Sequence, residues 1–226
     1  MSVETSAASS VLAVLFDFDG TLGDSYPAIT ASVNHVRALH RLPPLTLDEV
    51  RPHVGRGPLS LLQATVGSGD AEADVAAYRA HHPSVMREGT RLFPGVETAL
   101  RTAKQAGLLL GVCSNKPVAF TRALLAYFNV AALFDAVLGP EDVPRPKPAP
   151  DMLLAALARL NVSASEALYI GDMVVDIETA RAAGVVVWSV ATGSDRADVL
   201  EKARPDRLLH SLTELPALLS LDGRTS

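Results

Sequence analysis

The apolar residues of this 226-residue chain form short continuous runs, separated by stretches in which they recur with helical spacing. The runs that predict buried strands are residues 11–16, 108–113, 136–138, 168–170 and 185–190. Continuous runs of this kind are typical of parallel strands that are covered on both faces.

Between these runs, apolar residues return at every third or fourth position and so predict helices. One such stretch begins at Val96 and ends before Gly107, and another ends at Gly184. From residue 108 onward strand and helix alternate. This alternation predicts an α/β fold with a doubly wound, Rossmann-like parallel sheet.

Residues 17–107 interrupt this rhythm, because a βα unit normally takes only about 30 residues. Ile29, Val33 and Val36 recur at helical spacing, and Thr46 with Glu49 forms the pattern of a capping box. We therefore predict an inserted α-helical cap domain at 24–93. Residues 1–23 and 94–226 then form the core domain.

Composition and charge exclude several classes of protein. The chain is 48% hydrophobic and 20% charged, so it should fold, and its net charge is −5 with scattered basic residues, which disfavours nucleic-acid binding. No apolar run is long enough to span a membrane, and residues 1–10 lack the basic start of a signal peptide. With Cys113 as the single cysteine, an internal disulfide is excluded, and we expect a cytoplasmic protein with no membrane partner.

Two acidic residues follow the first predicted strand, in Asp17-Phe18-Asp19-Gly20-Thr21. Ligands of open α/β sheets bind beyond the carboxyl ends of the strands, where these carboxylates are expected. A solvated turn would also contain such a pair of acids.

Two further polar groups occupy comparable positions. Ser114 and Asn115 follow the second predicted strand, where a hydroxyl and free backbone amides favour anion binding, although Ser114 could equally be a helix cap. Lys147 lies between Pro146 and Pro148, which restrict the backbone that carries it. A solvated surface lysine is the alternative.

Asp172 and Asp176 follow the strand predicted at 168–170 and would lie one turn apart on a helix that begins there. Clustered carboxylates in an apolar setting repel one another unless a hard cation joins them, and oxygen ligands suit Mg²⁺. An interaction with the helix dipole would explain Asp172 alone.

In their order and spacing these motifs resemble the haloacid dehalogenase-like (HAD) phosphohydrolase superfamily, and within it the phosphoglycolate phosphatase-like branch. The resemblance covers nearly the whole chain. It is carried by Asp17-Phe-Asp-Gly-Thr-Leu, Asp24-Ser25, Phe93-Pro-Gly-Val, Ser114-Asn-Lys-Pro, Lys147-Pro-Ala-Pro, Tyr169-Ile-Gly-Asp172 with Asp176, and Ala183-Gly184.

The resemblance implies a role for each motif. Asp17 would be the nucleophile and Asp19 the general acid and base. Ser114 and Lys147 would hold the transferring phosphoryl group. The phosphate-binding residues would be Thr21, Ser114, Asn115 and Lys147. Mg²⁺ would be bound by Asp17, the main-chain carbonyl of Asp19, and Asp172, with Asp176 in support.

The inserted helices resemble the family's cap, which sets substrate choice. In residues 53–58, Arg56 could meet a substrate carboxylate, or it could be solvated in a mobile turn. Two positions depart from the family's usual pattern: Gly23 replaces a bulky apolar residue, and Met173 replaces a small serine. The first could loosen the turn that moves with the cap, and the second could shift the groups around the metal.

The resemblance implies a Mg²⁺-dependent phosphatase of a small phosphorylated metabolite, with 2-phosphoglycolate as the leading substrate. A phosphosugar mutase or an inorganic pyrophosphatase on the same scaffold is the alternative. Residues 25–91 contain no lysine, which disfavours the mutases and the phosphonate-cleaving relatives, since both use a cap lysine. A non-catalytic phosphate-binding protein would be expected to have lost one of the acids. A monomer and a homodimer both remain open.

Overall fold

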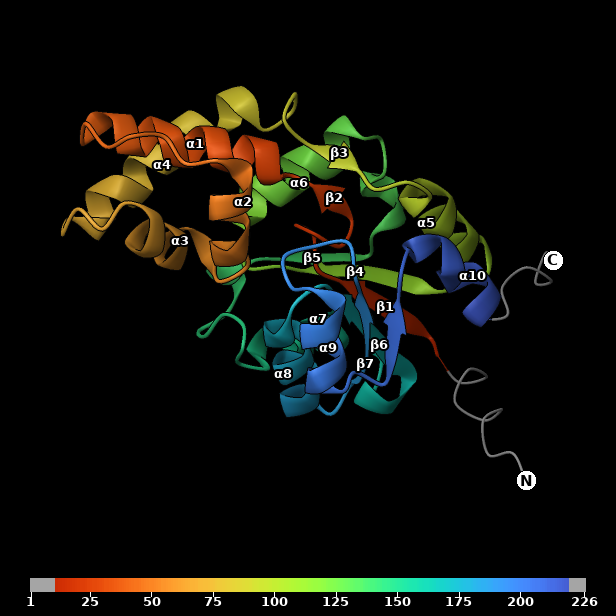
Figure 1. Ribbon diagram of the computed structural model, residues 1–226. Helices are drawn as coiled ribbons and strands as arrows, with labels where there is room; N and C mark the ends of the chain where they lie inside the picture. Colours follow the sequence, from red (N-terminus) through yellow and green to blue (C-terminus); the bar gives the residue numbers. More distant parts are fainter. Residues whose placement is uncertain (1–10, 220–226) are drawn as a thin grey trace.

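The computed structural model describes residues 11–219; residues 1–10, on which the signal-peptide argument depends, and 220–226 lie outside it. Its strands form one six-stranded sheet in the order β5-β4-β1-β6-β7-β8, in which all neighbours are parallel. The six strands are β1 (Ala13–Phe16), β4 (Leu109–Cys113), β5 (Ala136–Leu138), β6 (Ala167–Gly171), β7 (Val186–Val190) and β8 (Arg207–Leu209). The predicted α/β class is confirmed (Figure 1).

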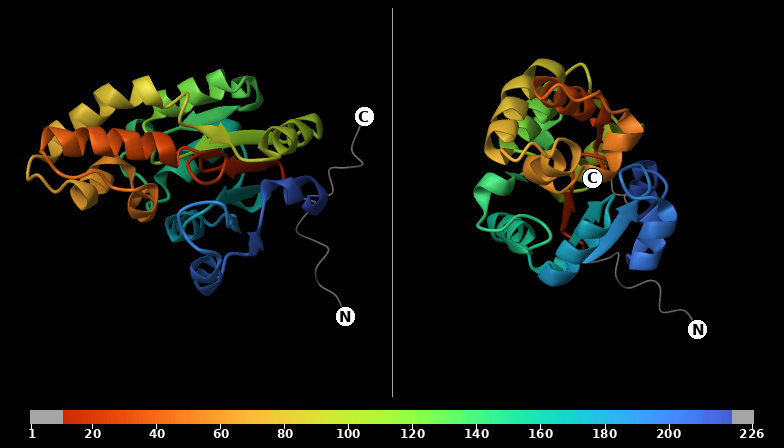
Figure 2. Two further views of the ribbon diagram at one scale, coloured as in Figure 1. Left: turned by 45° about the horizontal axis from the view of Figure 1, so that its top comes forward. Right: turned by 60° about the vertical axis from the view of Figure 1, so that its left-hand side comes forward.

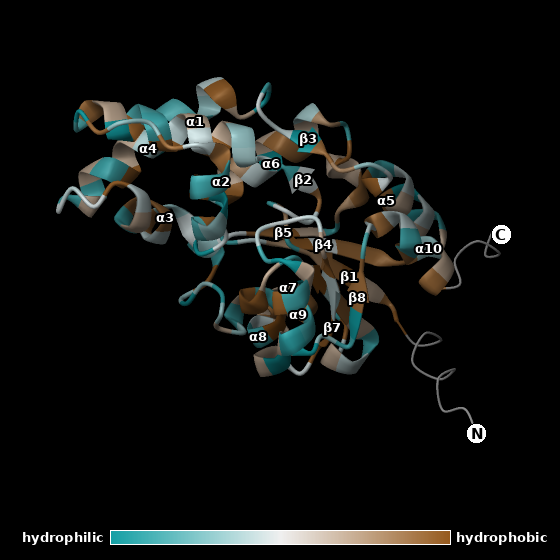
Figure 3. Ribbon diagram, viewed as in Figure 1, coloured by the Kyte–Doolittle hydropathy of each residue, from teal (hydrophilic) through white to brown (hydrophobic). Residues whose placement is uncertain are grey.

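Helices cover both faces of the sheet (Figure 2). Side chains of α5 (Val96–Gln105), α6 (Val118–Tyr127) and α10 (Leu215–Leu218) belong to the apolar cluster on one face. The opposite face packs against α7 (Asp151–Leu160), α8 (Val174–Ala183) and α9 (Ala197–Ala203). Alternation along β1 divides its residues between the two clusters, which explains why the whole strand is apolar (Figure 3).

The segment predicted as an insert is helical. It contains α1 (Tyr26–Leu39), α2 (Leu47–Val50), α3 (Gly57–Thr65) and α4 (Ala71–Val85), which share a third apolar cluster. The predicted capping box is present: the Glu49 amide donates to Thr46 Oγ1, and the Thr46 amide donates to Glu49 Oε2. We refer to residues 24–93 as the cap.

A two-stranded antiparallel sheet of β2 (Gly23–Asp24) and β3 (Arg91–Leu92) stands at the base of the cap. The sequence did not predict this small sheet, because each strand has only two residues. Strand β8 was also missed, since it has three residues, starts with an exposed Arg207 and lies at the edge of the sheet.

The three central strands end side by side. Phe16, the last residue of β1, pairs with Val112 of β4 and with Ile170 of β6. The residues that follow these strands therefore meet at one edge of the sheet. Within residues 11–219, no helix has both the length and the apolar character that crossing a bilayer requires.

Candidate active site

The turn after β1 places Asp17 and Asp19 at this edge. The Asp17 amide donates to the Ile170 carbonyl at 2.9 Å and so continues the pairing with β6. The chain then folds back, with the Gly23 amide donating to the Phe18 carbonyl at 2.9 Å. Both carboxylates are buried, with Asp17 only 3% exposed.

Gly20 makes this turn possible. Its φ of +88° is unfavourable for other residues, and a Cβ atom there would lie 2.3 Å from Oδ2 of Asp172 and 2.5 Å from the Tyr26 hydroxyl oxygen. The absence of a side chain lets the turn approach Asp172.

Three buried carboxylates converge below the turn. Asp17, Asp172 and Asp176 each offer an oxygen, and the three oxygens lie within 4.8 Å of one another. Burial, followed by the charges of Asp176 and Asp17, raises the pKa of Asp172 well above its ordinary value. The cluster therefore carries an excess of negative charge that favours a cation.

The sequence analysis placed Asp172 and Asp176 one turn apart on the same helix, and this prediction is wrong. Helix α8 begins at Val174, and Met173 before it has an extended backbone, so Asp172 precedes the helix while Asp176 lies in its first turn. Asp172 accepts hydrogen bonds from the Thr21 hydroxyl at 2.9 Å and from the Ser194 amide at 2.7 Å. Thr21, predicted to bind phosphate, directs its hydroxyl to this carboxylate.

Lys147 is buried between two of the acids. Its Nζ lies 2.7 Å from Oδ1 of Asp176 and 3.0 Å from Oδ1 of Asp17, and it donates to the Tyr169 hydroxyl at 2.9 Å. Burial alone would lower the pKa of Lys147, but the carboxylates of Asp17 and Asp176 outweigh this effect and raise it. Lys147 is therefore charged at neutral pH.

These residues fit a divalent cation. Oδ1 of Asp17 is buried and accepts no well-aligned hydrogen bond, although Lys147 is close to it. Asp176 is fully engaged, because its Oδ1 accepts from Lys147 and its Oδ2 accepts from the Met173 amide at 3.0 Å. Asp17, with an oxygen that accepts no well-aligned hydrogen bond, is thus the best placed to bind a metal, while Asp176 holds Lys147 and Asp172 accepts only from the neutral groups of Thr21 and Ser194.

The loop after β4 supplies Ser114 and Asn115, and both line the same pocket as Asp17. The side chain of Asn115 is already engaged. It accepts from the Lys147 amide at 3.0 Å and donates at 3.1 Å to the carbonyls of Lys147 and Gly55. Asn115 was predicted to bind phosphate, but its side chain joins the cap to the Lys147 loop.

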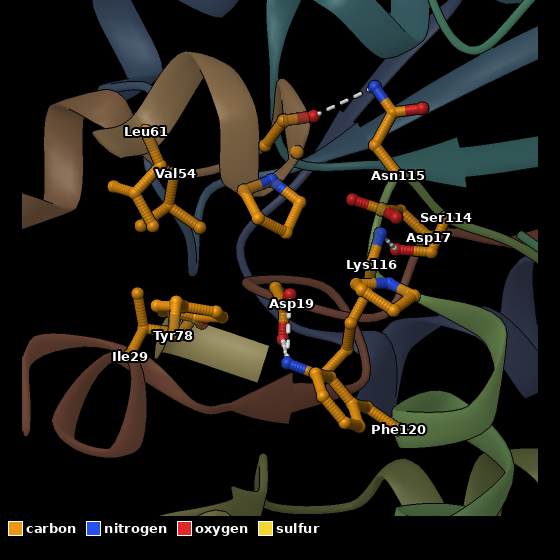
Figure 4. Close-up of a pocket in the computed structure, with 14 residues that line it drawn as sticks. Asp17, Asp19, Ile29, Val54, Leu61, Tyr78, Ser114, Asn115, Lys116 and Phe120 are labelled. Carbon is orange, nitrogen blue, oxygen red and sulfur yellow. Dashed lines mark hydrogen bonds and ion pairs between the residues drawn. The ribbon is translucent and has the colours of Figure 1, made fainter. Parts of the chain in front are cut away.

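Lys116, to which the sequence analysis gave no role, forms a buried ion pair with Asp19. Its Nζ lies 3.0 Å from Oδ1 and 3.2 Å from Oδ2 of Asp19 (Figure 4). The Ser25 hydroxyl donates to the same carboxylate. The position of Lys116 in the Ser-Asn-Lys motif was the only signal in the sequence.

The cap closes the pocket with apolar side chains. Ile29, Val54, Leu61 and Tyr78 face the core residues Asp17, Asp19 and Ser114 (Figure 4). The pocket therefore lies between the cap and the strand ends that carry the acids.

Three other residues that the sequence singled out do not line this pocket. Arg56 is exposed and lines a separate surface cavity together with Met173. Met173 also packs against the cap loop, since a Cβ atom on Gly55 would lie 2.1 Å from its sulfur atom. Gly23 lies under the Phe18 ring, and a Cβ atom on Gly23 would lie 3.1 Å from the nearest carbon of that ring.

The sequence analysis also missed the loop after β7. The Thr192 hydroxyl donates to the Gly20 carbonyl at 2.7 Å, and a Cβ atom on Gly193 would lie 1.8 Å from Oδ2 of Asp172. Its place after a predicted strand, at the same sheet edge as the motifs, was the available signal.

A doubly wound core with acids at the ends of its central strands and a helical cap above them defines a class of α/β hydrolases, and comparison with known proteins agrees with it. Residues 14–190 match the model of the haloacid dehalogenase-like hydrolase family. A phosphoglycolate phosphatase of Cereibacter sphaeroides is 36% identical over 213 residues, covering 91% of this chain and 96% of its own. A phosphoglycolate phosphatase of Escherichia coli is 31% identical over 230 residues, covering 91% of each.

Comparison with solved structures supports the same family. A haloacid dehalogenase-like hydrolase from Bacteroides fragilis superimposes with a TM-score of 0.86 at 31% identity, covering 91% of this chain and 99% of its own. A phosphatase from Clostridium acetobutylicum gives 0.83 at 27% identity, covering 91% and 97%. The chain belongs to the haloacid dehalogenase-like hydrolase family. Within it, the chain is a phosphoric monoester hydrolase.

Proposed function

We propose that this chain is a Mg²⁺-dependent phosphatase that hydrolyses a small phosphomonoester through an aspartyl-phosphate on Asp17. The observation that supports it most is the buried cluster of Asp17, Asp172 and Asp176, whose oxygens lie within 4.8 Å of one another beside Lys147. A carboxylate nucleophile, a cation site and a fixed positive charge are the groups that phosphoryl transfer to an enzyme requires.

Asp17, Asp172 and the main-chain carbonyl of Asp19 would hold Mg²⁺, with Asp176 in support. When bound, the cation reduces the repulsion between the carboxylates and the phosphoryl oxygens. That repulsion is about 4 kcal/mol for each pair of charges 4 Å apart at an effective dielectric constant of 20. Lys147 and Ser114 bind the phosphoryl oxygens from the protein side.

The reaction takes two displacements at phosphorus. A carboxylate oxygen of Asp17 forms a bond to phosphorus as the ester P–O bond breaks, and Asp19 gives its proton to the leaving alcohol. Asp19, now ionised, takes a proton from a water molecule as that water attacks the phosphorus atom. The bond to Asp17 breaks, inorganic phosphate leaves, and both carboxyl groups return to their starting states.

The substrate that the relatives favour is 2-phosphoglycolate, since the two curated relatives compared above carry the name phosphoglycolate phosphatase. We propose 2-phosphoglycolate, hydrolysed to glycolate and phosphate, as the leading substrate.

The test is phosphate release from a panel of small phosphomonoesters by the purified chain, with Mg²⁺ and with excess EDTA. We expect release that requires the cation and disappears in Asp17→Asn. Asp198→Asn is the matched control, because Asp198 is an exposed residue of α9, and it should retain full activity. Full activity of Asp17→Asn, or no release from any ester, would refute the proposal.

A further inference from the structure

The charges in the pocket are distributed unevenly between the core and the cap. Among the residues that line it, the charged ones are Asp17, Asp19 and Lys116, and all three belong to the core. Lys147 does not line the pocket; it lies against Asp17, where the proposed mechanism gives it the phosphoryl group and not the rest of the substrate. Lys116 is therefore the cation that a ligand in this pocket meets first.

The cap wall offers no charged partner. Its lining residues are apolar side chains, glycines, one proline and Tyr78, and the cap contains no lysine between residues 25 and 91. Arg56 lines a different cavity. A negative group on a bound substrate thus finds its counter-charge on the core side of the pocket.

Lys116 also has unused capacity to donate. An ammonium group has three N–H donors, and two of them are directed at the oxygens of Asp19, at 3.0 and 3.2 Å. The side chain is 3% exposed, and no further hydrogen bond from its Nζ is present within residues 11–219. One donor is left for a ligand while the other two stay on the Asp19 carboxyl group.

The position of Asp19 indicates which part of the substrate lies near Lys116. If Asp19 protonates the leaving oxygen, Lys116 borders the first atoms of the leaving alcohol. Lys116 Nζ lies 3.0 Å from Asp19 Oδ1, so a carboxylate on the first carbon of the leaving alcohol would be close enough to meet it, and Ile29, Val54 and Leu61 line the opposite, cap side of the pocket.

We propose that Lys116 determines specificity by binding the carboxylate of the leaving group, so that the preferred substrates are phosphate esters of short 2-hydroxy acids. The inference rests on the proposed function and deepens it, because it identifies the residue that discriminates between substrates. The apolar cap wall accepts a small alkyl substituent and rejects a second charge.

The experiment compares kcat/KM for three esters of similar size: 2-phosphoglycolate, ethyl phosphate and O-phosphoethanolamine. For the wild type we expect 2-phosphoglycolate to be preferred over ethyl phosphate by roughly ten- to hundredfold, the range of one hydrogen bond between charged groups. The cationic O-phosphoethanolamine should be the poorest. Equal values for all three esters would overturn the proposal without any variant.

Variants separate specificity from a general effect on Asp19. Lys116→Met should reduce the preference for 2-phosphoglycolate over ethyl phosphate at least tenfold, and Lys116→Arg should restore much of it. Lys202→Met is the matched control, because Lys202 is exposed on α9, and it should keep the wild-type ratio.

If Lys116→Met slows both esters equally, Lys116 only positions Asp19 and the proposal is wrong. If the wild type hydrolyses no ester at all, the proposed phosphatase function fails, and this inference fails with it. Hydrolysis by the wild type thus distinguishes the two failures: it is present if only the role of Lys116 is wrong, and absent if the phosphatase function is wrong.

Discussion

Asn115 connects the cap to the loop that carries Lys147. Its side-chain oxygen accepts from the Lys147 amide, and its side-chain nitrogen donates to the carbonyls of Lys147 and Gly55. The residue is 3% exposed, so each lost bond leaves a backbone group unpaired in a dry environment.

We expect Asn115→Ala to lower the free energy of unfolding by about 2–3 kcal/mol, on the order of 1 kcal/mol for each bond. We also expect a tenfold or greater loss in kcat, because the Lys147 backbone is no longer fixed. Asn34→Ala is the control: Asn34 makes a reciprocal pair of hydrogen bonds with the backbone of Leu45, both 2.8 Å, away from the site. It should lose stability but keep kcat in urea-unfolding and steady-state assays; equal losses of kcat in both variants would contradict the account.

Lys147 is the counter-charge of the buried acids. Lys147→Met should destabilise the metal-free chain by about 3–5 kcal/mol, since it leaves carboxylates buried without their partner. Lys104→Met, which removes a partly exposed ion pair with Asp135, should cost no more than about 1 kcal/mol. Chemical denaturation in EDTA measures both changes, and similar losses in the two variants would show that the buried pairs do not stabilise the fold.

For single residues, the sequence predicted which side chains belong to the site but not all of the contacts between them. Asp17, Asp19, Ser114 and Asp172 could be assigned to one site because each follows a run of apolar residues that predicts a strand. The ion pair of Lys116 with Asp19 joins residues 97 positions apart and depends on how the loops fold, so no local pattern encodes it. The same holds for the contact of Asn115 with Gly55.

At the scale of elements, the turn after β1 depends on Gly20. Gly20→Ala meets both an unfavourable φ of +88° and a Cβ atom 2.3 Å from Asp172, whereas Gly107 has φ +84° with no atom within 4 Å of such a Cβ. Gly107→Ala should therefore cost about 1–2 kcal/mol, the penalty for the backbone conformation alone.

Gly20→Ala should cost more than Gly107→Ala and should also abolish phosphatase activity, because Asp172 must move. Thermal unfolding and activity of the two variants, measured side by side, test this. Equal stability and retained activity in Gly20→Ala would show that the close approach to Asp172 is unimportant.

The strands that the sequence predicted are those with a continuous apolar run, and the missed strands lack one. Five of the six strands of the sheet came from apolar runs, and the end of α8 at Gly184 came from a glycine with φ +69°. The start of α8 was misplaced at Asp172, because its extended N-cap is Met173, a residue type with no capping preference.

At the scale of the whole molecule, the cap and the core meet around His82. This fully buried residue of α4 stacks on Tyr78 and lies tilted against Phe120 of α6, with ring centroids 5.0 and 5.1 Å away. Its Nδ1 lies 2.9 Å from the Ser32 hydroxyl oxygen. Burial, followed by the charges of Lys116 and His81, lowers the pKa of His82 to about 2.

This depressed pKa makes stability depend on pH with a definite sign. Below about pH 6.5 the unfolded chain binds a proton at His82 and the folded chain does not, so the free energy of unfolding falls as the pH falls. Between about pH 6.5 and pH 5 the loss from this one residue is about 2 kcal/mol.

His82→Phe should remove that contribution. The raised pKa values of Asp172 and Asp176 act in the opposite direction, but they are present in both proteins, so the difference between the two isolates His82. In urea-unfolding curves at neutral pH and at about pH 5, the free energy of unfolding of the wild type should fall by about 2 kcal/mol relative to that of the variant. Parallel pH dependences would contradict the assignment.

The most direct test of the central claim is to trap the phosphoryl group on the protein. The chain is mixed with Mg²⁺ and radiolabelled 2-phosphoglycolate, quenched in acid within one turnover, and digested. We expect the label on the peptide that contains Asp17, and none in Asp17→Asn. Label on another residue, or release of phosphate by Asp17→Asn at the wild-type rate, would contradict the assignment of Asp17 as the nucleophile.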